Sequence, residues 1–244
     1  MRSFVGSWGR AAARVGLALT AVACGTQKEN SASRAAVGVE STTPSATPAT
    51  GITAKPRILF LGTSLTAGLG LDPDSAFPAV IERRAGTDGL DVEVVNAGLS
   101  GETSAGALRR ADWLLSQRLA VIVIETGAND GLRGLDPDST AANITALIAK
   151  ARAAQPRAAI VLVQMEAPTN LGPAFQKRFH AVYPAVAKGT GVRLLPFLLD
   201  GVGGHPELNQ EDGIHPTAEG ARQVAANVYR GLKVVLDSLV PSAR

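Results

Sequence analysis

Three short segments that lie far apart in the chain carry side chains suited to nucleophilic acyl transfer. They are residues 62–65 (GTSL), 127–130 (GAND) and 212–215 (DGIH). In this order they supply a hydroxyl nucleophile, hydrogen-bond donors for a developing oxyanion, and an acid–base pair. Each segment is weak alone, but together they predict hydrolysis of an ester through a serine nucleophile.

Ser64 is the candidate nucleophile, because it follows a short apolar run that ends in a glycine. A serine at such a strand-to-helix turn can hold its hydroxyl at a helix N-terminus, open to substrate. The hydroxyl is a poor nucleophile until a base removes its proton. The alternative for Ser64 is the N-cap of the following helix, which is a common role for serine.

Asp212 and His215 form the candidate acid–base pair, in a loop just before the last predicted helix. In a tight turn, a spacing of three residues lets the carboxylate reach the imidazole, fix its tautomer and stabilise its charged form. The alternative is an unrelated surface aspartate and histidine. His180 is predicted to pack in a helix or lie on its surface, and His205 to line the mouth of the site. No two histidines have metal-ligand spacing, so we expect no metal and no cofactor.

Asn129 and Gly101 are the candidate donors to the oxyanion. Asn129 follows the third predicted strand and offers a side-chain amide, whereas Gly101 follows the second and offers a backbone N–H. One such donor is worth roughly 3–4 kcal/mol in known enzymes. The alternative is that both are ordinary turn residues, since glycine and asparagine are common in turns.

Alternating strands and helices surround these segments. Apolar and β-branched runs predict strands at residues 58–61, 92–95, 121–124, 159–163 and 192–195. Apolar residues at helical spacing predict helices at residues 76–84, 104–119, 141–154, 175–188 and 217–236. This alternation predicts an α/β fold with a parallel sheet covered on both faces. Because ligands bind at the carboxyl ends of such strands, the three segments can converge there.

Two of the predicted helices carry further expectations. The buried side of the helix at 104–119 is predicted to comprise Leu108, Trp113, Leu114 and Leu115. Pro184 is expected to kink or interrupt the helix at 175–188, because proline removes a backbone donor.

Together, the three segments resemble those of the SGNH (GDSL-type) hydrolases, whose blocks carry Ser, Gly, Asn and His in this order. The resemblance runs from about residue 57 to 236 and is closest to the bacterial arylesterase, thioesterase I and lysophospholipase subgroup. It implies a three-layer α/β/α sandwich with a five-stranded parallel sheet. It also implies an oxyanion hole made by the N–H of Ser64, the N–H of Gly101 and the side chain of Asn129.

Thr63 departs from that family pattern, which usually has aspartate at this position of the first block. The residue is neither nucleophile nor base. Threonine keeps a hydroxyl for local hydrogen bonding but loses the charge. We therefore expect altered loop stability or pH dependence, with catalysis retained.

The N-terminal region predicts export. Residues 1–24 read as a signal peptide, with three arginines followed by an apolar run of about nine residues, too short to span a bilayer. The run ends at Cys24 after small residues, which resembles a lipobox and predicts a lipid anchor in the cell envelope. The alternative is simple secretion to the periplasm or beyond. Residues 25–55, rich in Ser, Thr, Ala, Gly and Pro, predict a flexible linker, and residues 56–240 the hydrolase domain.

The charge composition of the chain argues against nucleic acid as a partner. The formal charge of +3 is accounted for by three arginines in the leader, so no basic face for nucleic acid is expected. We expect a monomer that binds a small-molecule or lipid ester. A carbohydrate O-deacetylase with the same fold is the first alternative. A non-catalytic ligand-binding lipoprotein is an alternative of another class.

Overall fold

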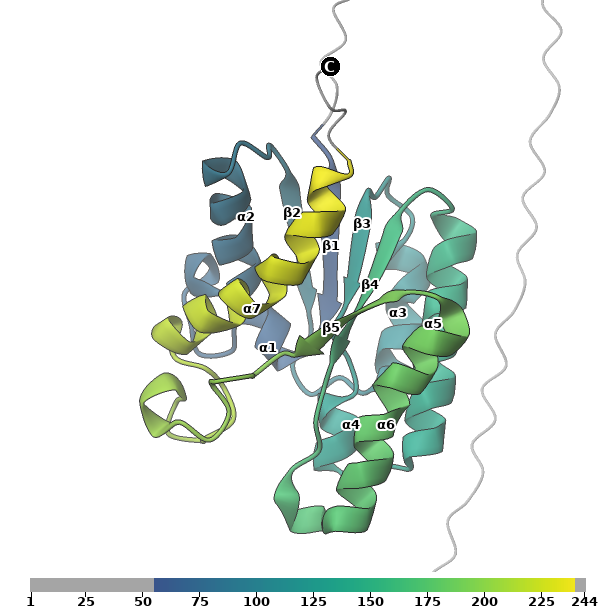
Figure 1. The fold of residues 1–244 in the computed structure, drawn as a ribbon, viewed down its shortest axis with the longest axis vertical. Helices are drawn as coiled ribbons and strands as arrows, with labels where there is room; N and C mark the ends of the chain where they lie inside the picture. The colour runs from purple at the N-terminus through teal and green to yellow at the C-terminus, as the bar shows by residue number, and fades with distance from the viewer. Residues whose placement is uncertain (1–54, 240–244) are drawn as a thin grey trace, which may run out of the picture. The chain divides into compact units, whose positions relative to one another are not determined.

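Five parallel strands form the centre of residues 55–239, the part of the chain that the computed structural model describes (Figure 1). They are β1 (Arg57–Gly62), β2 (Glu93–Gly98), β3 (Val121–Ile124), β4 (Ala159–Gln164) and β5 (Arg193–Phe197). Their order across the sheet is β2-β1-β3-β4-β5. All five predicted strands and the parallel sheet are therefore confirmed.

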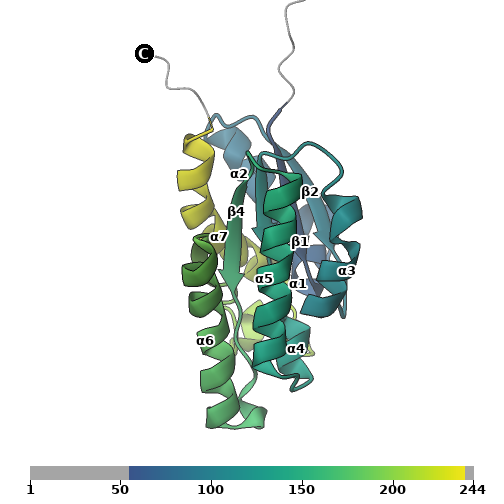
Figure 2. The same cartoon turned by 90° about the vertical axis from the view of Figure 1, so that its right-hand side faces the viewer.

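Helices cover both faces of this sheet, which completes the predicted three-layer sandwich. The α-helices are α1 (Ser64–Ala67), α2 (Phe77–Thr87), α3 (Ser104–Leu114), α4 (Ala128–Leu132), α5 (Pro137–Ala154), α6 (Pro173–Thr190) and α7 (Ala218–Asp237). Short 3₁₀ helices are η1 (Pro73–Ser75), η2 (Thr169–Leu171) and η3 (Pro206–Leu208). α2 and α7 pack together on one face, and α3, α5 and α6 pack in a row on the other (Figure 2).

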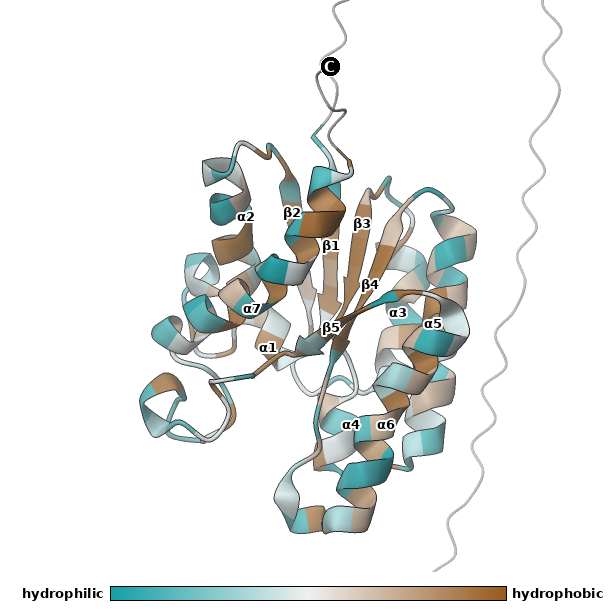
Figure 3. Ribbon diagram, viewed as in Figure 1, coloured by the Kyte–Doolittle hydropathy of each residue, from teal (hydrophilic) through white to brown (hydrophobic). Residues whose placement is uncertain are grey.

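The core lies between the sheet and these helices. All four residues of β3 are fully buried, as a central strand covered on both faces requires. Figure 3 shows the same pattern, with apolar strands in the middle and polar residues on the outer sides of the helices. Within residues 55–239, none of the helices has the length and apolar character needed to cross a membrane.

The helix predicted at 104–119 is shorter than expected, and its buried side differs. α3 ends at Leu114, and its buried side consists of small residues and one leucine, Ala107, Ala111 and Leu114, at helical spacing. Trp113 lies outside that stripe and is 77% exposed, so the prediction that it is buried was wrong. Residue size did not mark the packed side, because α3 buries the small side chains of Ala107 and Ala111 completely.

Pro184 was predicted to kink or interrupt its helix, and it does not interrupt α6. The helix continues to Thr190, and Pro184 lies on its exposed side. Proline leaves the carbonyl four residues earlier, that of His180, without a helical donor. The side-chain Nε2 of Gln164 donates to this carbonyl at 3.2 Å. The lost helical bond is thus replaced from β4.

The strand order creates the place where the site forms. The chain leaves β1 toward β2 on one side, and then returns past β1 to form β3 on the other. In open α/β sheets a crevice opens at such a switch point, beyond the carboxyl ends of the strands. Ser64 follows β1 and Asn129 follows β3, so both flank this crevice.

Candidate active site

Ser64 lies at a sharp turn between β1 and α1. Thr63 is the N-cap of α1, and its side chain accepts from the N–H of Leu65 at 3.4 Å. Ser64 is the first helical residue and is 9% exposed. The N-cap role considered for Ser64 therefore belongs to its neighbour, which leaves the Ser64 hydroxyl available for other contacts.

The structure brings Ser64, His215 and Asp212 into one hydrogen-bonded chain. The Nε2 atom of His215 lies 2.8 Å from the Ser64 Oγ, and its Nδ1 atom lies 2.6 Å from the Asp212 Oδ2. Asp212 thus faces the nitrogen opposite the one that contacts the serine. This arrangement fixes the imidazole so that its Nε2 can accept the hydroxyl proton.

The carboxylate of Asp212 is held by its own loop. Its Oδ1 accepts from the backbone N–H of Ile214 at 2.9 Å and of His215 at 3.0 Å. The backbone and side-chain hydrogen bonds from His215 lower the pKa of Asp212 to about 2, with a further contribution from Ile214. The group therefore stays ionised at neutral pH, although its side chain is 46% exposed.

Gln210 fixes the position of this loop beside α1. Its backbone N–H donates to the carbonyl of His215 at 2.7 Å. Its side-chain Nε2 donates to the carbonyl of Leu69 at 2.7 Å and to that of Pro216 at 2.9 Å. These contacts join the histidine loop to the segment after the serine, across 141 residues of sequence. No sequence pattern marks Gln210 for this role.

The two candidate oxyanion donors lie beside each other at the carboxyl ends of β2 and β3. Gly101 has a positive φ of 76°, a conformation that favours glycine. The Nδ2 of Asn129 donates to the carbonyl of Glu102 at 3.0 Å. An amide nitrogen carries two hydrogens, so the second remains available to a substrate oxygen. Asn129 lies in the first turn of α4, a short helix that was not among the predicted helices.

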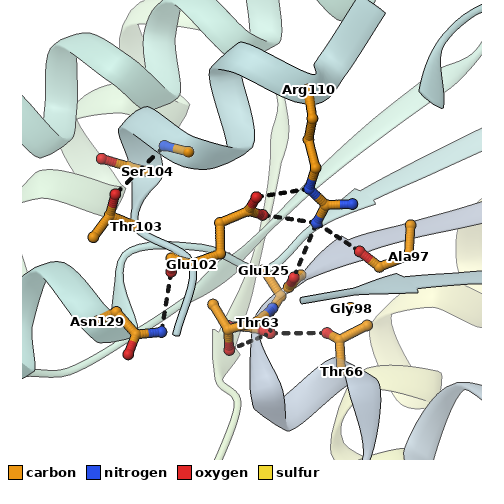
Figure 4. A network of polar contacts seen from close by, with 12 residues as sticks. Thr63, Thr66, Ala97, Gly98, Glu102, Thr103, Ser104, Arg110, Glu125 and Asn129 are labelled. Carbon is orange, nitrogen blue, oxygen red and sulfur yellow. Dashed lines mark hydrogen bonds and ion pairs between the residues drawn. The ribbon is translucent and has the colours of Figure 1, made fainter. Parts of the chain in front are cut away.

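A buried carboxylate, Glu125, supports the turn that holds Ser64 (Figure 4). It accepts from the N–H of Thr63 at 2.8 Å and from the hydroxyl of Thr66 at 2.8 Å, and both its oxygens lie 3.0 Å from the Thr63 hydroxyl. Burial raises the pKa of Glu125 to about 7, although these hydrogen bonds act in the opposite direction. Glu125 was not predicted as part of the site, because it directly follows an apolar strand and nothing local marks it.

An apolar pocket opens beside the serine and histidine. Its enclosed volume is about 10 Å³, so it is a shallow recess in the surface. Its lining joins Ser64 and His215 to side chains from α1, α2, α7 and nearby loops, namely Leu65, Leu69, Leu71, Phe77, Leu199, Pro216, Ala221 and Val224.

The other two histidines do not line this pocket. His180 lies on the exposed side of α6, with its Nδ1 2.7 Å from the Oε1 of Glu166. His205 is exposed and lies 3.3 Å from a carboxylate oxygen of Glu207. The surface position considered for His180 agrees with the structure, whereas His205 does not line the pocket mouth as expected.

Comparison with known proteins gives the family. Residues 60–223 match the GDSL-like lipase/acylhydrolase family. The chain is 41% identical to "Esterase TesA" of Pseudomonas aeruginosa over 73% of its own length and 89% of that protein. It is 37% identical to "Thioesterase 1/protease 1/lysophospholipase L1" of Escherichia coli K12, over 66% and 76% of the two chains.

A solved esterase structure has the same fold as this chain. The psychrotrophic esterase EstA from Pseudoalteromonas sp., inhibited by monoethylphosphonate, superposes with a TM-score of 0.71 at 34% identity. The match covers 75% of this chain and all of EstA. The chain belongs to the GDSL-like lipase/acylhydrolase (SGNH) family. It is a carboxylic ester hydrolase that acts on small-molecule esters, and the deacetylase and non-catalytic alternatives are not favoured.

Proposed function

We propose that Ser64 is the nucleophile of this esterase, His215 its general base and acid, and Asp212 the group that orients the histidine. The observation that carries the proposal is the continuous chain of contacts, 2.8 Å from serine to histidine and 2.6 Å from histidine to aspartate. The backbone N–H groups of Ser64 and Gly101 and the side chain of Asn129 form the oxyanion hole.

The reaction proceeds through an acyl-enzyme. The Ser64 Oγ attacks the ester carbonyl carbon while its proton passes to the Nε2 of His215, and the carbonyl oxygen becomes an oxyanion held by the three donors. His215 then returns the proton to the leaving alcohol oxygen as the C–O bond breaks. Water, activated by the same histidine, cleaves the acyl–serine bond and restores the free hydroxyl.

The substrate class follows from the pocket beside the triad. Its apolar lining favours esters with apolar acyl or alcohol parts over polar sugars. The relatives are named as an esterase and as a thioesterase and lysophospholipase. We assign aryl and alkyl acyl esters as substrates, with lysophospholipids and thioesters as further members of the class.

Hydrolysis of p-nitrophenyl esters from acetate to palmitate tests both parts of the proposal. Ser64→Ala and His215→Ala should each lower turnover by at least about 10³-fold. His205→Ala removes an exposed histidine outside the pocket and serves as the matched control, with turnover unchanged. Retained turnover in the Ser64→Ala protein would refute the serine mechanism, and the chain-length optimum defines the preferred acyl group.

The proposed location is the cell envelope. Residues 1–24 would direct export, and Cys24, which lies outside the described residues, would carry the lipid; secretion without a lipid is the alternative. Mass spectrometry of the N-terminal peptide distinguishes the two, with Cys24→Ser as control. We also propose a monomer, because every group of the triad and of the oxyanion hole comes from one chain. Light scattering of the purified protein tests this.

A further inference from the structure

A buried ion pair lies next to Asn129, one of the proposed oxyanion donors (Figure 4). Arg110 of α3 donates through Nε to the Glu102 Oε1 at 2.7 Å and through Nη2 to the Glu102 Oε2 at 2.7 Å. Only 5% of the Glu102 side chain and 22% of the Arg110 side chain are exposed. This two-point contact fixes the relative orientation of the two side chains more firmly than a single bond would.

Arg110 also holds the ends of two strands. Its Nη2 donates to the carbonyl of Ala97 in β2 at 2.7 Å, and it lies 3.3 Å from the carbonyl of Gly62 at the end of β1. Gly62 is separated from Ser64 by one residue. One guanidinium group therefore connects the strand before the nucleophile, the strand before Gly101, and the loop that contains Gly101.

The main chain of Glu102 contacts both remaining donors of the oxyanion hole. Glu102 is bonded to Gly101, whose N–H is one donor. The carbonyl of Glu102 accepts one hydrogen of the Asn129 amide at 3.0 Å, which sets the direction of the other hydrogen. A shift of Glu102 would thus turn the amide of Asn129 and displace Gly101, which carries the donor N–H on its preceding peptide.

We propose that Arg110 and Glu102 are positioning residues of the oxyanion hole. The inference rests on the proposed function. A buried ion pair is a costly way to stabilise a fold, and apolar residues of similar size often serve as well. The geometry of this pair instead fixes the relative positions of the three oxyanion donors, namely the N–H groups of Ser64 and Gly101 and the side chain of Asn129. An error of about 1 Å in such a site can cost about 10²-fold in rate.

Arg110→Lys tests the proposal, because lysine keeps the charge but cannot make the two-point contact. The matched control is Arg109→Lys, the same change at the neighbouring, exposed position of α3. We expect Arg110→Lys to lower kcat for p-nitrophenyl butyrate by about 10- to 100-fold, with KM changed less than threefold. The control should match the wild type. An Arg110→Lys protein with wild-type kcat would overturn the proposal.

A second readout separates positioning from general loss of structure. Paraoxon phosphorylates and parathion thiophosphorylates an active serine, each with release of p-nitrophenol, but only paraoxon places a P=O oxygen in the oxyanion hole. Arg110→Lys should lower the paraoxon-to-parathion rate ratio by about the same factor as kcat. A purely structural defect lowers both rates equally, so an unchanged ratio would count against positioning.

Two further proteins complete the test. Glu102→Gln keeps the shape of the side chain and leaves Arg110 bound to the two strand carbonyls, so it replaces Arg110→Lys should that variant fail to fold. It should show the same pattern in kcat and in the rate ratio, and normal values for both would overturn the proposal. Ser64→Ala tests the proposed function itself. If the Ser64→Ala protein retains activity, the proposed serine mechanism is refuted. If it is inactive while Arg110→Lys and Glu102→Gln both behave like the wild type, only the proposed positioning role is refuted.

Discussion

Replacing Thr63 by aspartate puts a second carboxylate next to the buried Glu125. In the wild type, Glu125 is surrounded by the donors of Thr63 and Thr66, and burial raises its pKa to about 7 from an ordinary value of 4.5. The unfolded chain therefore releases this proton at lower pH than the folded protein does. As a result, the contribution of Glu125 to stability falls between about pH 4.5 and 7 and is constant above pH 7.

The variant should lose stability above pH 7 as well. The Thr63 hydroxyl lies 3.0 Å from both Glu125 oxygens, and two carboxylates at such a distance cannot both ionise. The folded variant then keeps one proton that the unfolded chain has lost. Each pH unit over which this holds costs about 1.4 kcal/mol, so the loss between pH 7 and 9 is about 3 kcal/mol.

Urea unfolding at pH 7, 8 and 9 measures this effect. Asparagine has nearly the same volume as aspartate but no charge. The free energy of unfolding of the Thr63→Asn protein should therefore change with pH in the same way as that of the wild type. All other titrating groups are shared by the three proteins and cancel in the differences. If the free energy of unfolding of the Thr63→Asp protein also changes with pH as that of the wild type does, the reasoning is refuted. Its kcat at pH 7 should stay within about tenfold, since Thr63 contacts Glu125 rather than the reacting atoms.

Two other substitutions test neighbouring parts of the site. Asp212→Asn should lower kcat by about 10²- to 10⁴-fold, because its amide donates to the Nδ1 of His215 and moves the imidazole proton to the nitrogen that must accept from Ser64. Steady-state kinetics checks this, and a loss of less than tenfold would contradict it. Glu125→Gln should remove about 3 kcal/mol of pH dependence in the unfolding free energy between pH 4.5 and 7. An unchanged profile between those values would show that Glu125 does not titrate there.

Much of the fold could be predicted from the sequence, because strands and helices of a buried α/β sheet have strong local patterns. The five apolar runs became the five strands. Two predictions were wrong because tertiary packing overrode what side-chain size or local propensity favoured. Trp113 is exposed because α3 packs through alanines, and Pro184 is tolerated because Gln164 satisfies the carbonyl that proline leaves free. Neither contact has a sequence signal, since the partners lie in other elements.

The groups that could do the chemistry can be identified from residue types and spacings. The serine, the histidine and an aspartate three residues earlier are recognisable because residue type and short spacing carry their meaning. The structure adds the contact between Ser64 and His215, which are 151 residues apart. Only the order of the strands, β2-β1-β3-β4-β5, brings their segments to one crevice.

The residues that support the site from behind could be identified only after the chain had folded. Glu125 lies beneath Thr63 because β1 and β3 are neighbours in the sheet, a pairing across 62 residues. Arg110 reaches Glu102 and two strand ends because α3 packs where β1 and β2 finish. A charged residue in a sequence looks the same whether water or a buried partner surrounds it. Its role depends on burial and long-range contacts, and these exist only once the chain has folded.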